Sequence, residues 1–478
     1  MASPNYFKRL TRLKKLFWLY FLLLIFEGAL RKWVVPQLSA PLLIVRDPIA
    51  IMIIWEAYRT HRWPHRWSVM IAGLTVGLVG LFALQIIFGD NPLIVGLYGL
   101  RSYLLPFPVM FIMGDNLNDE DLQKLAECTV WLLLPMALLQ VAQYVAPPNS
   151  FLNKGAYEGG SQINYIGGHL RPSGTFSFAI GMVYFDTLAA AIIFYAMVSQ
   201  GFLKKWLLWA SVFALIVSIP TSGARTLLVQ LACIVGCMGV GALMGVSQFG
   251  RVLRVIVPVA VLAFLASLLP VFSDATHSMT ERISGANVAE GGDAQTALIY
   301  RGVKPAVDAV EEAWDSNNWI GIGMGRGAIA VSALLYGSNE AVAGEYEFSR
   351  ELLEMGPIAG GLFGLFKIFL GIAILGHVLS SVRKRETLAL LILPFAISLL
   401  LYSVPEQTTE QGFMVTCMAF CIAAARTEQL APQQLPLIFQ RQQQLFYRRV
   451  VQPGGNLKQR IPAARWHDKR ANPSDTNS

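Results

Sequence analysis

Acidic side chains crowd the stretch GEYEFSRELLEMGP, residues 344–357, directly before the apolar run GGLFGLFKIFLGIAIL. It holds four glutamates and one arginine, and a carboxylate can act as a general base that activates a hydroxyl nucleophile. On a helix, Glu347, Arg350 and Glu354 would share one face. Phe348, Leu352 and Met355 would form an opposing apolar stripe. Part of this charge is therefore predicted to have a structural role, with Arg350 paired to Glu347 and Glu354.

Two arginines lie in a pattern that suits an oxyanion ligand. Arg171 opens RPSGTFSF (residues 171–178), and Arg225 lies in TSGART (residues 221–226), each beside small and hydroxyl residues at the start of a predicted helix. Helix N-termini offer free N–H groups, and arginine forms bidentate bonds to phosphate. Two such arginines predict a pyrophosphate site; the alternative is that they reach lipid headgroups as interfacial side chains.

Further arginines lie outside, or a few residues below the outer surface, in the topology derived below. The full set is Arg31, Arg46, Arg101, Arg171, Arg225, Arg301, Arg326 and Arg350. Arg46 is predicted about seven residues into a span, where an ion costs at least ~2.5 kcal/mol. Pairing with neighbours, Arg46 with Asp47 and Arg31 with Glu27, is the alternative to a ligand-binding role for these two.

The elements that must position these groups are membrane-spanning helices. The chain has 478 residues, 54% hydrophobic and only 14% charged, and runs of roughly 20 apolar residues recur along it. We predict an all-α polytopic membrane protein with about twelve transmembrane helices. The predicted spans are residues 13–34, 39–58, 67–88, 93–113, 122–146, 176–199, 203–220, 225–246, 252–272, 357–380, 387–403 and 411–426.

Charge in the short connections predicts the orientation. Basic residues gather at the N-terminus and near residues 59–66, 204–205, 251–254 and 383–385, so both termini are predicted inside. Residues 1–426 then form one membrane domain, with a large helical outer loop at 273–356 between the ninth and tenth helices. Residues 427–478 are predicted to be a mostly disordered cytoplasmic tail.

Other signals are weaker. The glycine-rich run GIGMGRG, residues 321–327, lacks the βαβ setting of a nucleotide loop and is predicted to be a tight outer loop. His169 precedes Arg171 closely enough to be a supporting residue, and Asp186 is either a polar bridge or a site group.

The five cysteines lie in apolar runs without metal-ligand neighbours, so no metal or cofactor is predicted. The net charge of +8 reflects topology rather than nucleic-acid binding.

Together, RPSGTFSF, TSGART, the stretch YRGVKPAVDAVEEAWDSNNWIGIGMGRGA and the final ExG motif at Glu354 resemble the bacterial O-antigen ligase and polysaccharide polymerase superfamily. The resemblance covers mainly residues 165–360 and the helix count. It implies transfer of an undecaprenyl-pyrophosphate-linked glycan at the outer face of the bacterial plasma membrane, without metal. By it, Arg171, Arg225, Arg301 and Arg350 would bind the donor pyrophosphate. We further predict Glu354, Arg46, Arg101 and His169 as supporting residues.

The family pattern has a histidine nine residues before the glutamate of ExG, where this chain has Glu345. Glu345 is therefore the first candidate base and Glu347 the second. The missing histidine favours polymerisation of lipid-linked repeat units over ligation to lipid A core or another acceptor. The resemblance also implies a glycan acceptor, and a flippase and a chain-length regulator as partners. The alternative of another class is a lipid-linked oligosaccharide flippase, although no internal repeat is evident.

Overall fold

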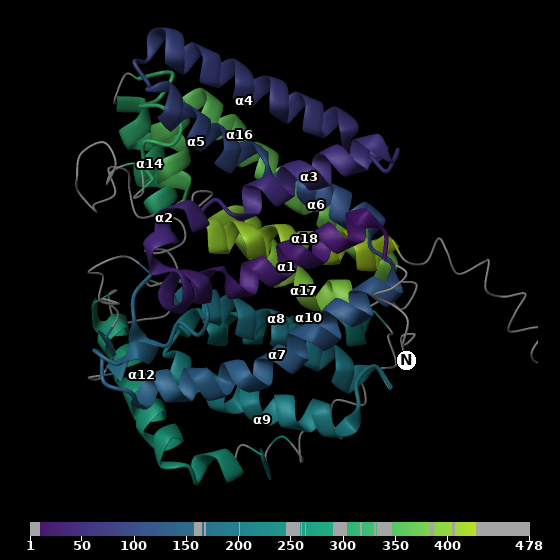
Figure 1. The fold of residues 1–478 in the computed structure, drawn as a ribbon, viewed down its shortest axis with the longest axis vertical. Helices are drawn as coiled ribbons and strands as arrows, with labels where there is room; N and C mark the ends of the chain where they lie inside the picture. Colours follow the sequence, from purple (N-terminus) through teal and green to yellow (C-terminus); the bar gives the residue numbers. More distant parts are fainter. Residues whose placement is uncertain are drawn as a thin grey trace, which may run out of the picture. The chain divides into compact units, whose positions relative to one another are not determined.

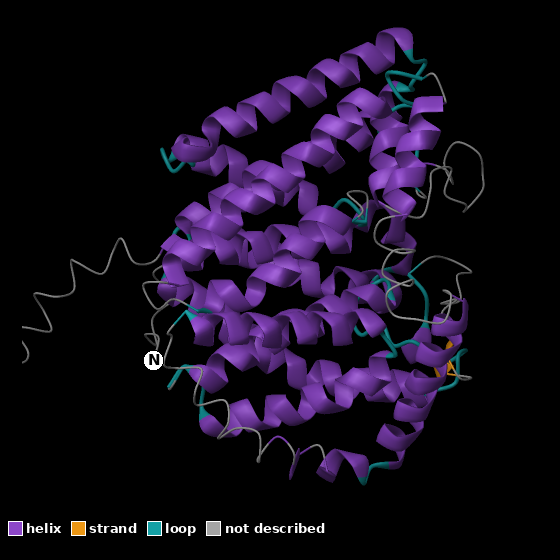
Figure 2. Cartoon of the chain, turned by 180° about the vertical axis from the view of Figure 1, so that it is seen from behind, coloured by secondary structure: helices purple, strands orange, loops and turns teal. Residues whose placement is uncertain are grey.

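Helices make up nearly all of the described chain in this computed structural model (Figures 1 and 2). The structure describes residues 10–156, 165–166, 169–199, 201–244, 259, 261–262, 264–289, 304–315, 318–328, 331, 347–382, 387–403 and 407–426. The predicted tail, Arg301 and Glu345 lie outside these residues.

The α-helices are α1 (Arg12–Ala29), α2 (Ser39–Leu42), α3 (Arg46–Arg59), α4 (Ser68–Phe88), α5 (Leu93–Leu104), α6 (Pro106–Asn116), α7 (Asp119–Val145), α8 (Ala179–Val198), α9 (Lys205–Ser222), α10 (Arg225–Leu243), α12 (Pro270–Ala289), α14 (Lys304–Asp315), α16 (Glu347–Val382), α17 (Leu388–Tyr402) and α18 (Thr408–Arg426). Shorter turns are the π-helix η2 (Leu30–Val34) and the 3-10 helices η3 (Pro36–Leu38), η4 (His65–Trp67) and η5 (Phe151–Asn153). Strands β1 (Tyr165–Ile166) and β2 (His169–Leu170) pair antiparallel.

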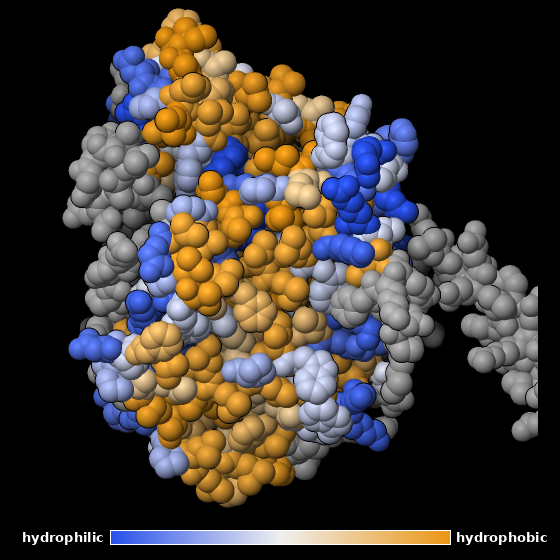
Figure 3. Space-filling model, in the orientation of Figure 1, coloured by the Kyte–Doolittle hydropathy of each residue, from blue (hydrophilic) through white to orange (hydrophobic). Residues whose placement is uncertain are grey.

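Seven helices are long and apolar enough to cross a membrane, among the residues that the structure describes. They begin at His65, Leu93, Asp119, Ala179, Lys205, Arg225 and Glu347, each within a few residues of a predicted span or, for the last, ten residues before it. On the face seen in Figure 3, apolar side chains cover the middle of the helices and hydrophilic ones gather at both ends. These features indicate a membrane-embedded helical protein, and the count of twelve spans stays a prediction.

Prolines break two of the predicted spans. The span at 39–58 is divided into α2 and α3, so Arg46 begins α3 instead of lying seven residues inside a helix, which corrects the prediction. Pro48 lies in the first turn of α3, where a proline is tolerated because its missing N–H has no helical partner. The span at 93–113 likewise divides at Leu105, directly before Pro106.

The acidic turn at residues 115–124 lies beside basic segments. Asp121 pairs with Lys14 of α1, and Asp115 pairs with Arg66 at 3.1 Å. Asn118 and Asp121 also form a capping box that begins α7. These contacts pair the acidic turn with basic residues from two of the segments whose positive charge predicted the orientation.

Helix α18 lies at the centre of the bundle, between α6 and α17 (Figure 1). Nearly every residue from Thr408 to Ala425 is buried. Within residues 273–356, predicted to be a helical loop, the described residues include most of α12 and all of α14, whereas the outer location of the loop stays a prediction. Helix α14 packs Ala309 and Ala313 against Leu352 and Phe348 of α16, the apolar stripe expected from the sequence.

Helix α16 turns back on itself at Gly356, which has φ +80°. Glu347–Met355 then packs against the helix that follows: a Cβ on Gly360 would lie 2.7 Å from the Glu351 carbonyl oxygen, and one on Gly364 would lie 2.8 Å from the Phe348 ring. The charged stretch therefore folds against the apolar helix instead of leading straight into it. All four of its charged residues in the described chain, Glu347, Arg350, Glu351 and Glu354, are buried.

We expect Gly356→Ala to lower the free energy of unfolding by about 1–3 kcal/mol, because a left-handed backbone and a close carbonyl both oppose a side chain there. The added Cβ would lie 2.3 Å from the Trp319 carbonyl oxygen. Thermal unfolding in nanodiscs measures the effect. Gly361→Ala is the matched control, since nothing lies within 4 Å of its Cβ position; equal unfolding temperatures for the two variants would contradict the assignment.

Candidate functional site

The segment Arg171–Phe178 docks on the end of α1. Gly174 has φ +56°, and the Gln143 side chain brackets it, accepting from the Gly174 N–H at 2.7 Å and donating to its carbonyl at 3.2 Å. Gly28 of α1 lets the segment approach closely, because a Cβ there would lie 2.4 Å from the Ser177 nitrogen. The conformation of RPSGTFSF is therefore set by tertiary contacts from α1 and α7.

Two cations of η2 reach into this segment. Arg31 donates to Ser177 Oγ at 2.9 Å, and Lys32 donates to Ser173 Oγ at 2.9 Å and to the Gly174 carbonyl at 2.6 Å. Lys32 is 0% exposed and Arg31 is 1% exposed. π-Helical turns are rare and often occur at functional sites. The π-helical conformation of η2 is therefore a second indication of a site here, independent of the charges of Arg31 and Lys32.

The two arginine motifs lie next to each other. Arg171 Nε donates to the carbonyl of Ser222 at 3.5 Å, and Gly223, in the left-handed conformation, then leads into Arg225 at the first position of α10. Arg171 and Arg225 are both half-buried. The predicted proximity of these motifs is thus present in the structure.

Two hydroxyl groups of TSGART, those of Thr221 and Ser222, bond to nearby backbone groups. Thr221 donates to the Val217 carbonyl, and Ser222 Oγ donates to Ile219 and accepts from the Ala224 N–H. These two hydroxyls are engaged by backbone groups, and the predicted phosphate cradle stays a prediction. Arg225 begins α10, and helix N-termini offer N–H groups without helical partners, which suit an anion.

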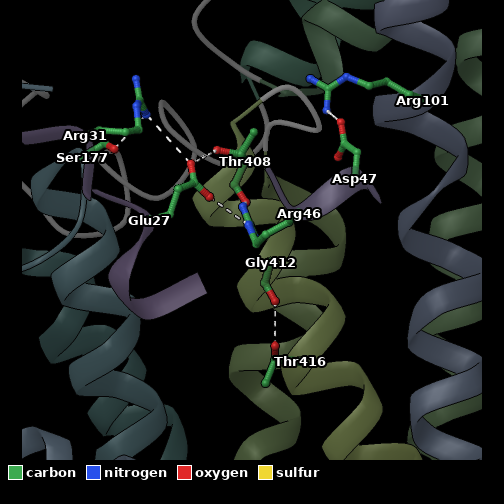
Figure 4. A network of polar contacts seen from close by, with 9 residues as sticks. All are labelled: Glu27, Arg31, Arg46, Asp47, Arg101, Ser177, Thr408, Gly412 and Thr416. Carbon is green, nitrogen blue, oxygen red and sulfur yellow. Dashed lines mark hydrogen bonds and ion pairs between the residues drawn. The ribbon is translucent and has the colours of Figure 1, made fainter. Parts of the chain in front are cut away.

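Arg46 and Arg101 are held by carboxylates (Figure 4). Arg46 Nε lies 2.9 Å from Glu27 Oε2, and Arg46 also donates to the Thr408 carbonyl. The Arg46 side chain packs on Gly412, where any Cβ would overlap its guanidinium. Asp47 pairs with Arg101, so the predicted pair of Arg46 with its neighbour Asp47 is wrong.

Glu27 joins this network to η2. Its Oε1 accepts from Thr408 Oγ1 at 3.3 Å and lies 3.9 Å from Arg31 Nη1, which confirms the predicted pair of Glu27 with Arg31 (Figure 4). One buried carboxylate therefore serves two arginines. Arg46 and Arg101 have structural contacts that suffice for their positions, and their assignment as supporting residues of a ligand site stays a prediction.

Glu354 holds the glycine-rich loop. Its two oxygens accept from the N–H groups of Gly325 and Gly327 at 2.9 and 2.6 Å, and Oε2 also accepts from the Tyr103 hydroxyl at 3.0 Å. Gly321, Gly323 and Gly325 all have positive φ, and residues 319–320 and 324–327 form turns, as the sequence predicted. Glu354 is thus a support for the loop.

The remaining predicted site residues lie on three different elements, α16, β2 and α8. Glu347 is 4% exposed, with Oε1 at 3.9 Å from Lys367 Nζ, and Arg350 is 6% exposed on the same helix. His169 is described only as a strand residue paired with Ile166. Asp186 is fully buried in α8, and neither of its carboxylate oxygens has a hydrogen-bond partner among the described residues.

The sequence did not predict several buried polar residues that lie beside the segments Arg171–Phe178 and Glu347–Met355. Lys32, Gln143, Glu351 and Lys367 are all less than 5% exposed. Lys367 alone had a usable signal, because a single charge inside an apolar run marks a buried polar contact. In the part of the chain that the structure describes, no three His, Cys, Asp or Glu side chains are grouped to hold a metal ion.

Comparison with known proteins adds no assignment: no protein-family model matches the chain, and no curated protein matches it. What the fold and site define is a membrane-embedded helical protein with two buried polar centres. One centre is cationic and lies between α1, the segment Arg171–Phe178 and α10. The other contains the carboxylates of Glu347–Met355 and Lys367.

Replacing Glu354 with Gln should release the glycine-rich loop, because an amide offers one acceptor where two backbone N–H groups need two. Losing one such bond to a buried charge costs about 1–3 kcal/mol. Hydrogen exchange of residues 321–328, followed by mass spectrometry, should accelerate about tenfold or more. Glu312→Gln on the exposed face of α14 is the control; unchanged exchange in Glu354→Gln would refute the clamp.

Proposed function

We propose that this protein transfers a glycan from a polyprenyl-pyrophosphate donor to a hydroxyl acceptor at the outer face of a bacterial plasma membrane, extending lipid-linked repeat units. The donor pyrophosphate would bind at the cationic centre, contacted by Arg171, Arg225 and Lys32. Arg301 and Arg350 are further donor ligands by the resemblance of the motifs. The acceptor hydroxyl would be activated by Glu345 or Glu347.

The observation that carries this proposal is the environment of Lys32. Its ammonium is fully buried, and among the described residues its contacts are neutral: Ser173 Oγ, the Gly174 carbonyl and the Trp33 ring. A buried ion without a counter-charge costs several kcal/mol. An anionic ligand beside the segment that carries Arg171 would remove this penalty, and a pyrophosphate brings at least two negative charges.

The chemistry requires little beyond positioning and charge. The base accepts the proton of the acceptor hydroxyl, the oxygen bonds to the anomeric carbon, and the bond from that carbon to the pyrophosphate oxygen breaks. Negative charge then grows on the leaving group, where fixed guanidinium and ammonium groups stabilise it most. A single base suffices for such an inverting displacement.

The decisive experiment uses purified protein in nanodiscs with a synthetic undecaprenyl-pyrophosphate oligosaccharide in excess EDTA. We expect a ladder of longer lipid-linked glycans on gels, with polyprenyl pyrophosphate released in equal amount. Transfer to lipid A core without a ladder would favour the ligase alternative. Translocation of the donor across proteoliposomes without any new glycosidic bond would overturn the transferase proposal in favour of a flippase.

Variants of the cationic centre test donor binding directly. Lys32→Met and Arg171→Lys should each weaken binding of the pyrophosphate donor about tenfold or more, since each loses or distorts a charge-assisted bond to phosphate. Because Lys32→Met removes a buried charge, its unfolding temperature without donor should be equal or higher.

Arg66→Lys is the control for the arginine change, since Arg66 pairs with Asp115 at the opposite end of the helices. Equilibrium binding of a fluorescent polyprenyl pyrophosphate to nanodiscs provides the measurement. Wild-type affinity in both Lys32→Met and Arg171→Lys would exclude the pyrophosphate site.

A further inference from the structure

Helix α14 exposes a row of large apolar side chains. The row consists of Val307, Val310 and Trp314, spaced three and four residues apart, and of Trp319 just beyond the helix. The ring centres of Trp314 and Trp319 lie 5.2 Å apart, and each of the four residues is between 45% and 59% exposed. We call these four residues the α14 stripe. Apolar side chains grouped in this way favour a partner that removes them from water.

The α14 stripe lies between a packed face and a charged face of the helix. At about 100° per residue, its three helical members point within about 60° of one another. On one side of them, Ala309 and Ala313 are buried against Leu352 and Phe348 of the segment Glu347–Met355. On the other side, exposed charged residues form the third face: Lys304, Asp308, Glu311, Glu312 and Asp315. A strongly charged face beside an apolar one is typical of a helix that lies in the membrane interface.

The end of α4 lies close to Trp319. Gln85, in the last turn of α4, donates to the carbonyl of Ile320, the next residue after Trp319, at 2.7 Å. Ile87 and Phe88 of the same turn are exposed. Helix α4 belongs to one of the candidate membrane spans among the described residues. The apolar surface of a candidate span thus ends close to Trp319.

Trp319 also lies against the turn of α16. A Cβ on Gly356 would overlap the Trp319 carbonyl, so the backbones of these two residues are in contact. Ile358 and Leu362, on the part of this candidate span that follows Gly356, are exposed. Helix α14 lies alongside α16 (Figure 1). Trp319 therefore joins the α14 stripe to the apolar surfaces of two candidate spans.

The chemistry of the α14 stripe suits lipid rather than glycan. Valine side chains offer no hydrogen bonds, and the two tryptophan rings meet at 78°, so they form no single flat platform for a sugar ring. Tryptophan is enriched at membrane–water interfaces, where its ring meets apolar chains and its N–H meets water. The charged face carries four acidic residues and one lysine, so apolar contact must hold the helix there rather than attraction to anionic headgroups.

We propose that α14 lies on the surface of the bilayer, with the α14 stripe inserted among the headgroups and first acyl carbons of zwitterionic phospholipid and the charged face in water. Because Ala309 and Ala313 pack against Glu347–Met355, this lipid contact ties the charged segment to the bilayer surface. The contact would hold the segment in place whether or not the protein transfers glycans.

Site-specific photo-crosslinking identifies what covers the α14 stripe. In separate variants, the photoreactive residue p-benzoylphenylalanine replaces Trp314, Val310 or, as the control on the charged face, Glu312. Each full-length variant is reconstituted in phosphatidylcholine nanodiscs, irradiated and digested, and mass spectrometry quantifies the lipid and protein adducts. We expect phosphatidylcholine adducts at Trp314 and Val310 to exceed those at Glu312 about fivefold or more.

A pair of substitutions tests whether lipid contact stabilises the helix. Val307→Ser with Val310→Ser should accelerate hydrogen exchange of residues 304–315 in nanodiscs about fivefold or more, because the helix loses part of its lipid contact. Asp308→Ser with Asp315→Ser is the matched control on the charged face. Valine, serine and aspartate have similar helix propensities, so intrinsic propensity does not separate the two variants.

Lipid adducts concentrated at the α14 stripe, together with faster exchange in the valine variant alone, would establish the bilayer contact. The proposal is overturned by equal lipid adducts at Trp314 and Glu312, by adducts to a second copy of the chain in place of lipid, or by equal exchange in the two serine variants. Glycan transfer without lipid adducts would remove this surface and leave the proposed function standing, and lipid adducts without any transfer would do the opposite.

Discussion

The carboxylate of Glu354 connects the charged segment Glu347–Met355 to the glycine-rich loop, and the positions of both segments depend on this contact. It binds two N–H groups of the glycine-rich loop and the Tyr103 hydroxyl. Gln85 reinforces the same junction, donating to the carbonyls of Ile320 and Glu354 and accepting from the Met324 N–H. Because the loop is anchored here, Gly356 can hold its left-handed conformation, and Glu347–Met355 is fixed against the helix that follows.

Buried charge follows one physical rule in most of this protein. A charge buried between helices loses most of its hydration, so it requires a partner. Arg46 has Glu27, Arg101 has Asp47 and Lys367 has Glu351. Lys32 departs from the rule in the described chain, because its partners are neutral oxygens and a ring. That departure lies beside the motif with Arg171, which is why it supports an anionic ligand more strongly than the arginines do alone.

The sequence by itself determined the helical class, the positions of most helices and the role of the glycine-rich run as a tight loop, because apolar length and glycine content are local properties. It also indicated that Arg171 and Arg225 belong to neighbouring motifs. The partners of charged residues could not be predicted in the same way. Arg46 and Asp47 are adjacent in the first turn of α3, where consecutive side chains point about 100° apart. Arg46 therefore contacts Glu27 of α1, and Asp47 contacts Arg101 of α5. Only the tertiary structure decided that Glu354 clamps a loop, that Lys32 lies among neutral groups and that Glu351 pairs with Lys367. Those facts depend on contacts between residues up to hundreds of positions apart, which no local pattern encodes.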